Sequence, residues 1–376
     1  DYVRCVVPMR YYSEFRRVTL PATMVATVDG KKADDREAEN AAINLAGAIE
    51  IDLFRGLDDF SNAGVFDGNP LAVPVDSIPN MLGLGLQVRQ SDMQINSRDL
   101  QFAEYGSEES VVLSGAGSTL TQGLVEDASL RSSIGFGNAK SLIVDDVVLS
   151  AYNKITFGKE RIILAGSPQD ATGGDLRKHW VSGGTVTVEA SPFLRAKFRP
   201  ARPSTHPSAP VAPVSVSVLA GSGGSLAAGD YIYFATTGNE IGESVKCASA
   251  TASGVTLGQK VTVTITHPGS GIYRYFNVYR TAAGGAESTA KFIGRVKVAN
   301  AATTDFVDLG NKVPGFVTGY LVQDDAAGIK ELCPYSRQKL AVTELSTPEA
   351  HFRFLTLAVY KPRQFVLIDN LKGTIS

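Results

Sequence analysis

A proline-rich stretch divides the sequence. Five prolines fall within fifteen residues, at Pro200, Pro203, Pro207, Pro210 and Pro213. Because proline fixes φ and has no amide hydrogen to donate, such a stretch forms a stiff linker and not part of a core. Domains usually have about 100–200 residues, so this chain of 376 residues is expected to contain two domains, or three.

After the linker, short alternating strands are separated by Gly-rich turns. Strands are expected at 214–218, 231–234, 261–265, 273–279, 291–296 and 306–307. Regularly spaced short strands of this kind are typical of a β-sandwich of the immunoglobulin or fibronectin type III class. Its only cysteine is Cys247, which excludes the inter-sheet disulfide of antibody domains. This domain must therefore be stabilised by its apolar core.

Before the linker, the sequence predicts a strand and then a long helix. Residues 6–17 mix apolar side chains with arginines, which indicates an extended segment with one charged side. Asp34 and Glu37 have the spacing of a capping box. Apolar residues then recur every three or four positions, so a helix is expected over 34–55, with Gly56 ending it.

The remaining segments predict an α+β fold interrupted by the sandwich. A strand is expected at 111–113, a helix at 119–134 capped by Ser118 or Thr119, and a strand turning into a helix over 141–149. These elements alternate without a regular βαβ period, which favours α+β over a parallel sheet. Two apolar strands, 353–360 and 364–368, flank a basic proline turn near the end. The predicted organisation is an α+β domain made of 1–203 and 323–376, with an all-β insertion at 204–322.

The charge balance and the cysteine count exclude several classes of protein. There are 36 Lys and Arg and 38 Asp and Glu, a net charge of −2, which argues against wrapping nucleic acid by charge alone. The chain has no run of 18 apolar residues, so no membrane-spanning helix is expected. Its three cysteines cannot form a disulfide framework or a zinc cage. No signal peptide precedes Asp1, and we expect either a cut precursor or numbering that starts within a longer chain.

Patterns that would indicate catalysis are weak. The four histidines, at 179, 206, 267 and 351, are far apart and are expected to be solvated or hydrogen-bonded structural residues. There is no Gly-x-Ser-x-Gly elbow, although a Ser–His–Asp triad can be assembled from distant positions. The Gly-rich run 114–118 lacks the Lys-Ser/Thr ending of a phosphate loop. We therefore expect no enzyme activity and no catalytic residues.

Sites for metals or cofactors are not indicated either. Acidic pairs occur at 34–35, 58–59, 145–146 and 324–325, but none has the spacing of an EF-hand, and we expect solvated turn residues. A basic cluster around Arg195 and Arg199 can contact phosphate, yet such a patch beside a linker more often faces solvent or an acidic neighbour. We expect no metal site and no cofactor.

Three stretches together resemble one known family. The first is 8–19 leading into a helix that ends at 48–56, the second is 231–244 with 276–280 and 292–295, and the third is 332–335 with 360–363 and 368–371. Their order resembles the major capsid proteins of tailed bacteriophages with the Hong Kong 97-type fold, in the lineage with an immunoglobulin-like insertion. The resemblance implies a spine helix, a central sheet and an inserted sandwich. The family's N-terminal arm and extended loop have no counterpart here, so no loop-mediated cross-link is implied.

The resemblance implies a structural major capsid protein that assembles into the hexamers and pentamers of an icosahedral phage head. The expected partners are copies of the chain itself, with decoration, portal and scaffolding proteins as further partners. Double-stranded DNA inside the head would contact the inner face only weakly, and no membrane is involved. The expected location is the virion, after assembly in the host cytoplasm. Two alternatives stay open: a non-viral encapsulin-like shell protein, and a surface adhesion protein built on a fibronectin-like module.

For a shell protein, the functional residues are those at contacts between subunits. Residues expected at such contacts are Arg16, Arg17, Glu37, Arg195 and Arg199. The two arginines of the first strand are expected to face an acidic edge of a neighbour, with two solvated arginines as the alternative. The inserted sandwich has a slight excess of basic residues and is expected to project from the outer surface, toward neighbouring capsomers or glycans.

Overall fold

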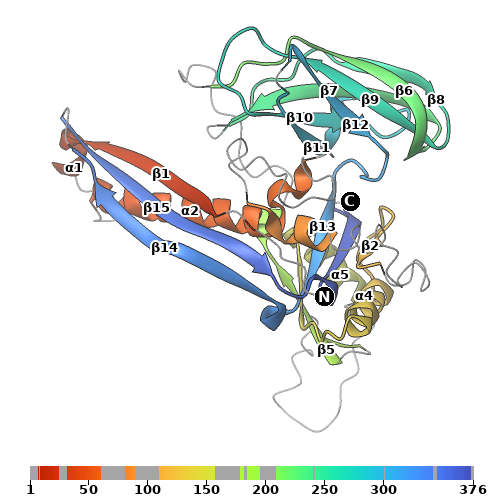
Figure 1. Cartoon of the computed structure of the whole chain (residues 1–376), viewed down its shortest axis with the longest axis horizontal. Helices are drawn as coiled ribbons and strands as arrows, with labels where there is room; N and C mark the ends of the chain where they lie inside the picture. Colours follow the sequence, from red (N-terminus) through yellow and green to blue (C-terminus); the bar gives the residue numbers. More distant parts are fainter. Residues whose placement is uncertain are drawn as a thin grey trace. The chain divides into compact units, whose positions relative to one another are not determined.

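The chain folds into two compact units, each made of several segments. The computed structural model describes residues 7, 9–24, 32–60, 81–89, 110–156, 178–181, 184–194, 209–239, 242–299, 301–341 and 345–373. The first unit contains Asp1–Asp58, Pro79–Gln87 and Asp324–Lys361. The second contains Asp59–Ile78, Val88–Gln323 and Pro362–Ser376. Figure 1 shows the elements of both units along the chain.

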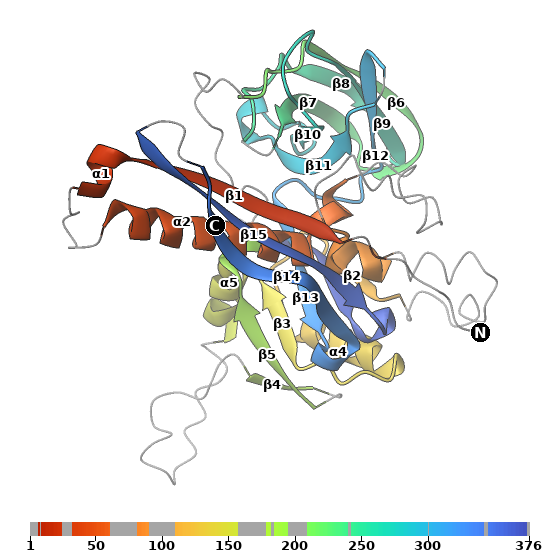
Figure 2. The same cartoon turned by 60° about the vertical axis from the view of Figure 1, so that its left-hand side comes forward.

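The first unit is a three-stranded antiparallel sheet with one long helix. Its strands are β1 (Arg10–Thr19), β14 (Ala327–Lys339) and β15 (Ser346–Val359), in the order β1-β15-β14. The short α1 (Leu20–Met24) follows β1, and α2 (Ala33–Phe54) then runs along β1 and β15 (Figure 2). The strand β1 thus comes from the start of the chain, and the other two strands of the sheet come from its end.

The helix α2 confirms the predicted spine helix to within one residue at each end. Its buried positions include Ala41, Leu45 and Ile49, which belong to the predicted apolar stripe. The helix ends at Phe54, and Gly56 follows with φ +42°. A Cβ at Gly56 would lie 2.3 Å from the carbonyl oxygen of Met81, so this close approach requires glycine.

The predicted capping box is wrong. The residue before the helix is Lys32, and no side chain caps the first turn. Asp34 instead lies inside the first turn, where its charge is favourable to the helix dipole, and it accepts a hydrogen bond from Thr347 Oγ1 at 3.4 Å. Glu37 bonds to a strand and not to the helix N-terminus. Both carboxylates bond to residues of β1 and β15, and the spacing of residues within the helix does not predict these distant partners.

A six-stranded mixed sheet forms part of the second unit. Its order is β2-β16-β13-β3-β5-β4, with β2–β16 and β3–β5 parallel and the other pairs antiparallel. The strands are β2 (Val112–Ser114), β3 (Ser141–Val144), β4 (Lys178–Val181), β5 (Gly184–Ala190), β13 (Phe316–Val322) and β16 (Val366–Lys372). The predicted mixture of helices and strands is thus observed, with some parallel pairing.

Two helices share the core of this sheet. They are α4 (Gln122–Ile134) and α5 (Asp146–Thr156), which contribute Val125, Ala128, Val148 and Tyr152 to the core. The N-cap of α4 is Thr121, whose Oγ1 accepts a hydrogen bond from the Leu124 amide at 3.3 Å. The predicted caps, Ser118 and Thr119, are therefore wrong.

Short 3-10 turns lie at Gly56–Asp59, Pro192–Leu194, Glu287–Thr289, Asp324–Ala326 and Pro362–Gln364.

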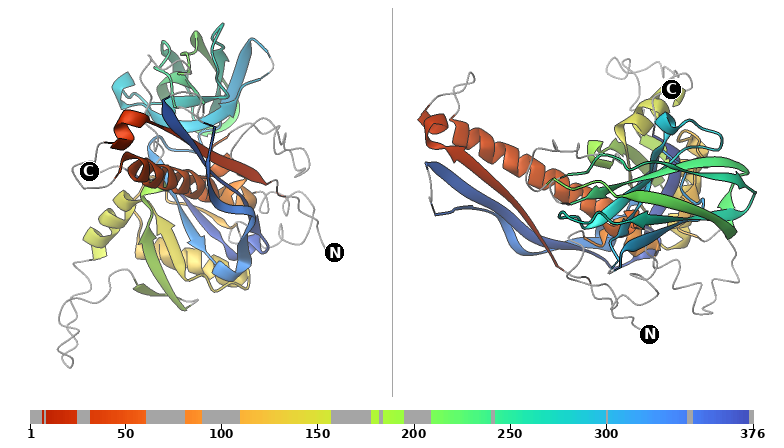
Figure 3. Two further views of the ribbon diagram at one scale, coloured as in Figure 1. Left: turned by 90° about the vertical axis from the view of Figure 1, so that its left-hand side faces the viewer. Right: turned by 90° about the horizontal axis from the view of Figure 1, so that it is seen from above.

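The second unit also contains a two-layer β-sandwich. Its sheets have the orders β11-β10-β7-β8 and β12-β9-β6, and their inner faces share one apolar core. The strands are β6 (Ser215–Leu226), β7 (Gly229–Gly238), β8 (Ala250–Val255), β9 (Gln259–Thr266), β10 (Tyr275–Arg280), β11 (Lys291–Lys297) and β12 (Thr303–Asp308). Figure 3 shows these strands from two further directions.

The strand order of the sandwich refines two predictions. In an immunoglobulin constant domain the first two strands pair, whereas β6 and β7 here belong to different sheets. A two-layer sandwich is therefore observed, without the immunoglobulin pairing. In addition, β13 belongs to the six-stranded sheet, so the sandwich ends before residue 316 and the predicted boundary at 322 is one strand too late.

Candidate assembly surface

The first strand carries charged side chains on its covered side and aromatic side chains on its exposed side. Even-numbered residues of β1 are buried or half-buried, and odd-numbered ones are exposed. The half-buried or buried set on the side of α2 includes Arg10, Glu14 and Arg16, whereas the exposed set includes Tyr11 and Phe15. The covered side of β1 thus carries these charged side chains beside buried Tyr12 and Val18, and the exposed side carries Tyr11 and Phe15 together with Arg17.

Two of the predicted contact residues bind each other within the chain. Arg16 forms ion pairs with Glu14 at 3.0 Å and with Glu37 at 3.2 Å, which ties β1 to α2. Arg17, on the opposite side of the strand, donates from Nε to Ser346 Oγ at 2.8 Å. The structure thus brings Arg16 and Glu37 together and separates Arg17 from them. Their role between subunits stays a prediction.

The other two predicted contact residues, Arg195 and Arg199, lie outside the described residues. The predicted single charged side of the first strand is also incorrect, because Arg16 and Arg17 alternate between the two faces. Alternation is visible in the sequence, but which face is buried depends on the helix that covers it.

An ionic cluster around the buried Glu349 carboxylate lies on β14 and β15, across the sheet from β1. Glu349 is opposite Arg16 in the register and accepts two hydrogen bonds from Arg337, at 2.6 and 2.9 Å. These bonds hold the pKa of Glu349 below its usual value, against the opposing effect of burial. Lys339 Nζ lies 4.0 Å from the same carboxylate.

His351 is completely buried beside this cluster. Its Nδ1 lies 2.7 Å from the Tyr335 hydroxyl on β14, and its Nε2 lies 3.8 Å from Glu349 Oε2. Burial lowers the pKa of His351, so the imidazole is neutral near pH 7. Glu14 faces it from β1 in the register. The expectation of a hydrogen-bonded structural histidine is confirmed here.

The same expectation is confirmed for two other histidines. His179 Nε2 lies 2.9 Å from the Tyr152 hydroxyl, and His267 Nε2 lies 2.7 Å from Thr304 Oγ1. His206 lies outside the described residues. Within the described ranges, no group of three or more His, Cys, Asp and Glu side chains is placed to hold a metal ion. Nor is any helix in those ranges long and apolar enough to cross a membrane.

The outer face of the first unit carries an aromatic cluster that the sequence analysis did not identify. Tyr11 and Phe15 on β1 are 66% and 67% exposed. Tyr11 packs edge-to-face on Phe354 with ring centroids 4.7 Å apart, and Phe354 stacks with Phe352 at 5.5 Å. We call these four residues the aromatic face. Its sequence signal is the two-residue period of Tyr11, Ser13 and Phe15, which alternates with Arg10, Tyr12, Glu14 and Arg16.

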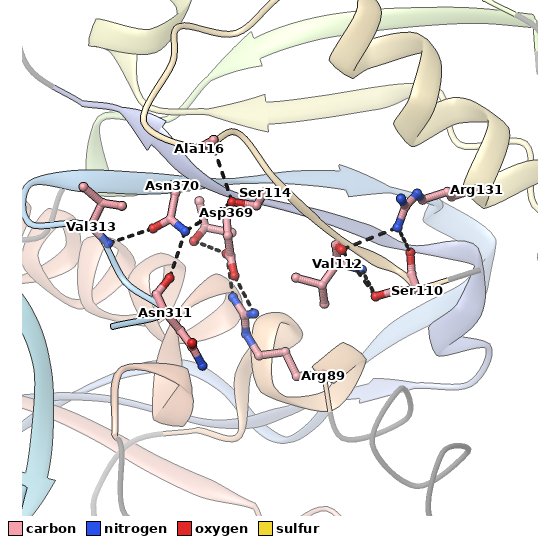
Figure 4. A network of polar contacts seen from close by, with 11 residues as sticks. Arg89, Ser110, Val112, Ser114, Ala116, Arg131, Asn311, Val313, Asp369 and Asn370 are labelled. Atoms are coloured by element: carbon pink, nitrogen blue, oxygen red, sulfur yellow. Dashed lines mark hydrogen bonds and ion pairs between the residues drawn. The ribbon is translucent and has the colours of Figure 1, made fainter. Parts of the chain in front are cut away.

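A polar network in the second unit holds the segment that leaves the sandwich (Figure 4). Asn370, at φ +56°, accepts from the Val313 amide and donates to the Asn311 carbonyl, both at 2.9 Å. Next to it, Asp369 forms an ion pair with Arg89 at 2.6 Å. Burial by itself raises the pKa of Asp369, but the charge and hydrogen bonds of Arg89 outweigh this effect and hold the pKa low. Asn370 of β16 therefore holds the segment that follows β12 through its bonds to Asn311 and Val313.

Comparison with known proteins finds only a distant structural similarity, to a shell protein among others. No family model and no curated protein matches the chain. Among solved structures, the chain is similar to the SrpI encapsulin of Synechococcus elongatus PCC 7942, with 7% identity and a TM-score of 0.37. The match covers 98% of this chain and 75% of that one. That neighbour is a capsid-like shell, and neither the family models nor the curated proteins point to a bacteriophage capsid in particular.

Proposed function

We propose that this chain is a structural shell protein, the major capsid protein of an icosahedral bacteriophage head around double-stranded DNA. The observation that carries the proposal is the first unit, in which one helix covers one face of a three-stranded sheet and leaves aromatic rings exposed on the other. Isolated soluble proteins rarely expose contiguous apolar surface of this kind, which is typical of interaction sites. The element order adds support, because a long helix precedes a mixed sheet interrupted by a sandwich.

The proposed mechanism is assembly through surfaces. Each subunit makes heterologous contacts that close into rings of five or six, and the rings join into a shell. Ion pairs join β1 to α2 and β14 to β15, and together with the backbone pairing of β1 with β15 they serve to keep the first unit rigid. A net charge of −2 supports weak contact with DNA, because tight binding requires many phosphate contacts by Lys and Arg. No catalytic step is part of the proposal.

A non-viral shell is the second candidate, and its support is the element order that the two classes share. One experiment separates them: the full-length protein is expressed, sedimented through a gradient, and viewed by negative-stain microscopy after nuclease treatment. The proposal predicts closed particles, which carry no cargo protein when the chain is expressed alone and protect DNA when the same chain is isolated from virions. Closed particles without DNA, filled with a cargo protein, would favour the second candidate, whereas a protein that never forms particles would contradict both.

A further inference from the structure

The aromatic face differs from the rest of the sheet in carrying almost no charge. Between Tyr11 and Phe15 the exposed residue is Ser13, and the cross-strand partners are Phe354, Phe352 and Ala350. The next positions on β14 are Cys333, Ser336 and Gln338. On β1, Glu14 and Arg16 lie on the opposite side of the strand, and Arg17 is the one charged residue of that strand on the exposed side. The side chains of Tyr11, Ser13 and Phe15 and of their partners on β15 thus form an uncharged surface.

The neutrality of the aromatic face selects among possible occupants. Nucleic acid and anionic membranes are bound by clusters of Lys and Arg, whereas the exposed side of β1 carries the single arginine Arg17, whose Nε donates a hydrogen bond to Ser346. A contact with a second copy of the chain does not require a cluster of Lys and Arg. An uncharged face can pack against a like subunit without like-charge repulsion, which would otherwise oppose self-association.

The size of the aromatic face fits the centre of a protein interface. A buried aromatic residue contributes about 150–250 Å², so Tyr11 and Phe15, two-thirds exposed, offer about 200–300 Å² together. A standard interface buries about 800 Å² on each partner, with aromatic anchors at the centre and polar residues at the rim. Serine and glutamine neighbours on the same face match that rim.

We propose that the aromatic face of β1 and β15 is a contact between subunits, where Tyr11 and Phe15 pack on a second copy of this chain. This inference rests on the proposed function for its biological setting. Its physical basis is the exposure of Tyr11 and Phe15 on the side of β1 away from α2, where they lie beside Phe352 and Phe354. The contact stabilises the assembly through apolar burial, not through the arginines predicted from sequence.

The test compares Phe15→Lys with Leu257→Lys in the full-length protein, by sedimentation velocity over a range of concentrations. Leu257 is an equally apolar side chain, 80% exposed in a turn of the sandwich. Phe15→Lys is expected to raise the concentration needed for self-association at least about tenfold, while Leu257→Lys leaves it unchanged. Circular dichroism establishes that each variant is folded. Equal behaviour of the two variants would overturn the inference.

A measurement on the unaltered protein covers the case in which Phe15→Lys does not fold. Hydroxyl-radical footprinting is expected to show Tyr11 and Phe15 protected in the assembled protein and reactive after dilution. Unchanged reactivity of both residues would overturn the inference. If Phe15→Lys forms closed shells normally, the inference is wrong and the proposed function stands. If the wild-type protein forms only a dimer that never closes into a shell, and Phe15→Lys makes that dimer monomeric, the inference stands and the proposed function is wrong.

Discussion

Asp308 tests the account of what holds the sandwich together. Its side chain and that of Arg280 are each 5% exposed and form a buried ion pair. The same carboxylate accepts a hydrogen bond from the Tyr233 hydroxyl at 3.0 Å and from the Gly310 amide at 2.9 Å. Asp308→Ala removes all three interactions and leaves the Arg280 guanidinium buried, with only the Lys312 carbonyl, at 2.8 Å, still accepting from it.

The expected cost follows from that uncompensated charge. Removing one partner of a buried pair costs about 3–5 kcal/mol, far more than the pair contributes relative to an apolar replacement. For a domain of this size each kcal/mol shifts the melting temperature by about 4–8 °C, so the sandwich should melt about 12 °C or more below wild type. The double variant Arg280→Met/Asp308→Leu should recover most of that loss, because it removes both charges.

Hydrogen exchange measured by mass spectrometry on the full chain provides the assay, since it reports the opening free energy of β10 and β12 separately from the first unit. The matched control is Asp305→Ala on the same strand, where an exposed carboxylate accepts a hydrogen bond from Thr264 Oγ1 at 2.6 Å. Asp305→Ala should lower the free energy of unfolding of the sandwich by no more than about 0.5 kcal/mol. If Asp308→Ala and Asp305→Ala change the exchange of these strands equally, the reasoning about the buried pair is wrong.

Three further predictions concern the first unit and the sheet. Because the pKa of His351 is lowered in the folded state, the stability of the first unit should fall as pH drops below about 6.5, with a second loss below about pH 4.3 as Glu349 is protonated; denaturant titrations of His351→Gln should lack the first loss only. Tyr12→Phe should cost about 1–3 kcal/mol in the same titrations, because buried Asp52 loses a hydrogen bond of 2.8 Å, and a smaller cost than Tyr11→Phe would contradict this. Asn370→Ala should cost more than Asn370→Gly in thermal melts, since both lose the side-chain bonds but only alanine is strained at φ +56°; the reverse order would refute the role of the backbone.

The sequence predicts the elements whose signal is local. The spine helix follows from an apolar stripe and an acidic first turn, and Gly56 ends it because only glycine fits so close to the Met81 carbonyl. The turn 361–363 between two apolar strands is likewise found where the proline predicts it. These features depend on residues within a few positions of each other, so tertiary contacts do not alter them.

Elements that depend on distant partners were missed or misjudged. β14 contains Pro334, which argues against a strand, yet the register shifts before this proline and again across it, which accommodates it. β8 is rich in Ala, Ser and Gly, with low strand propensity, and forms only because β7 pairs with it. The paired state of Arg16 and the exposure of Phe15 depend on which face α2 covers, and no spacing along β1 contains that information.

The mass of the purified full-length protein under assembly conditions tests the central claim most directly. One chain has a mass of 39.9 kDa. If the chain is a shell subunit, single-particle mass measurement should find closed particles whose masses are large whole multiples of that value, with footprinting protection of the aromatic face. A single species of one chain mass at every concentration, with Tyr11 and Phe15 fully reactive, would contradict the account.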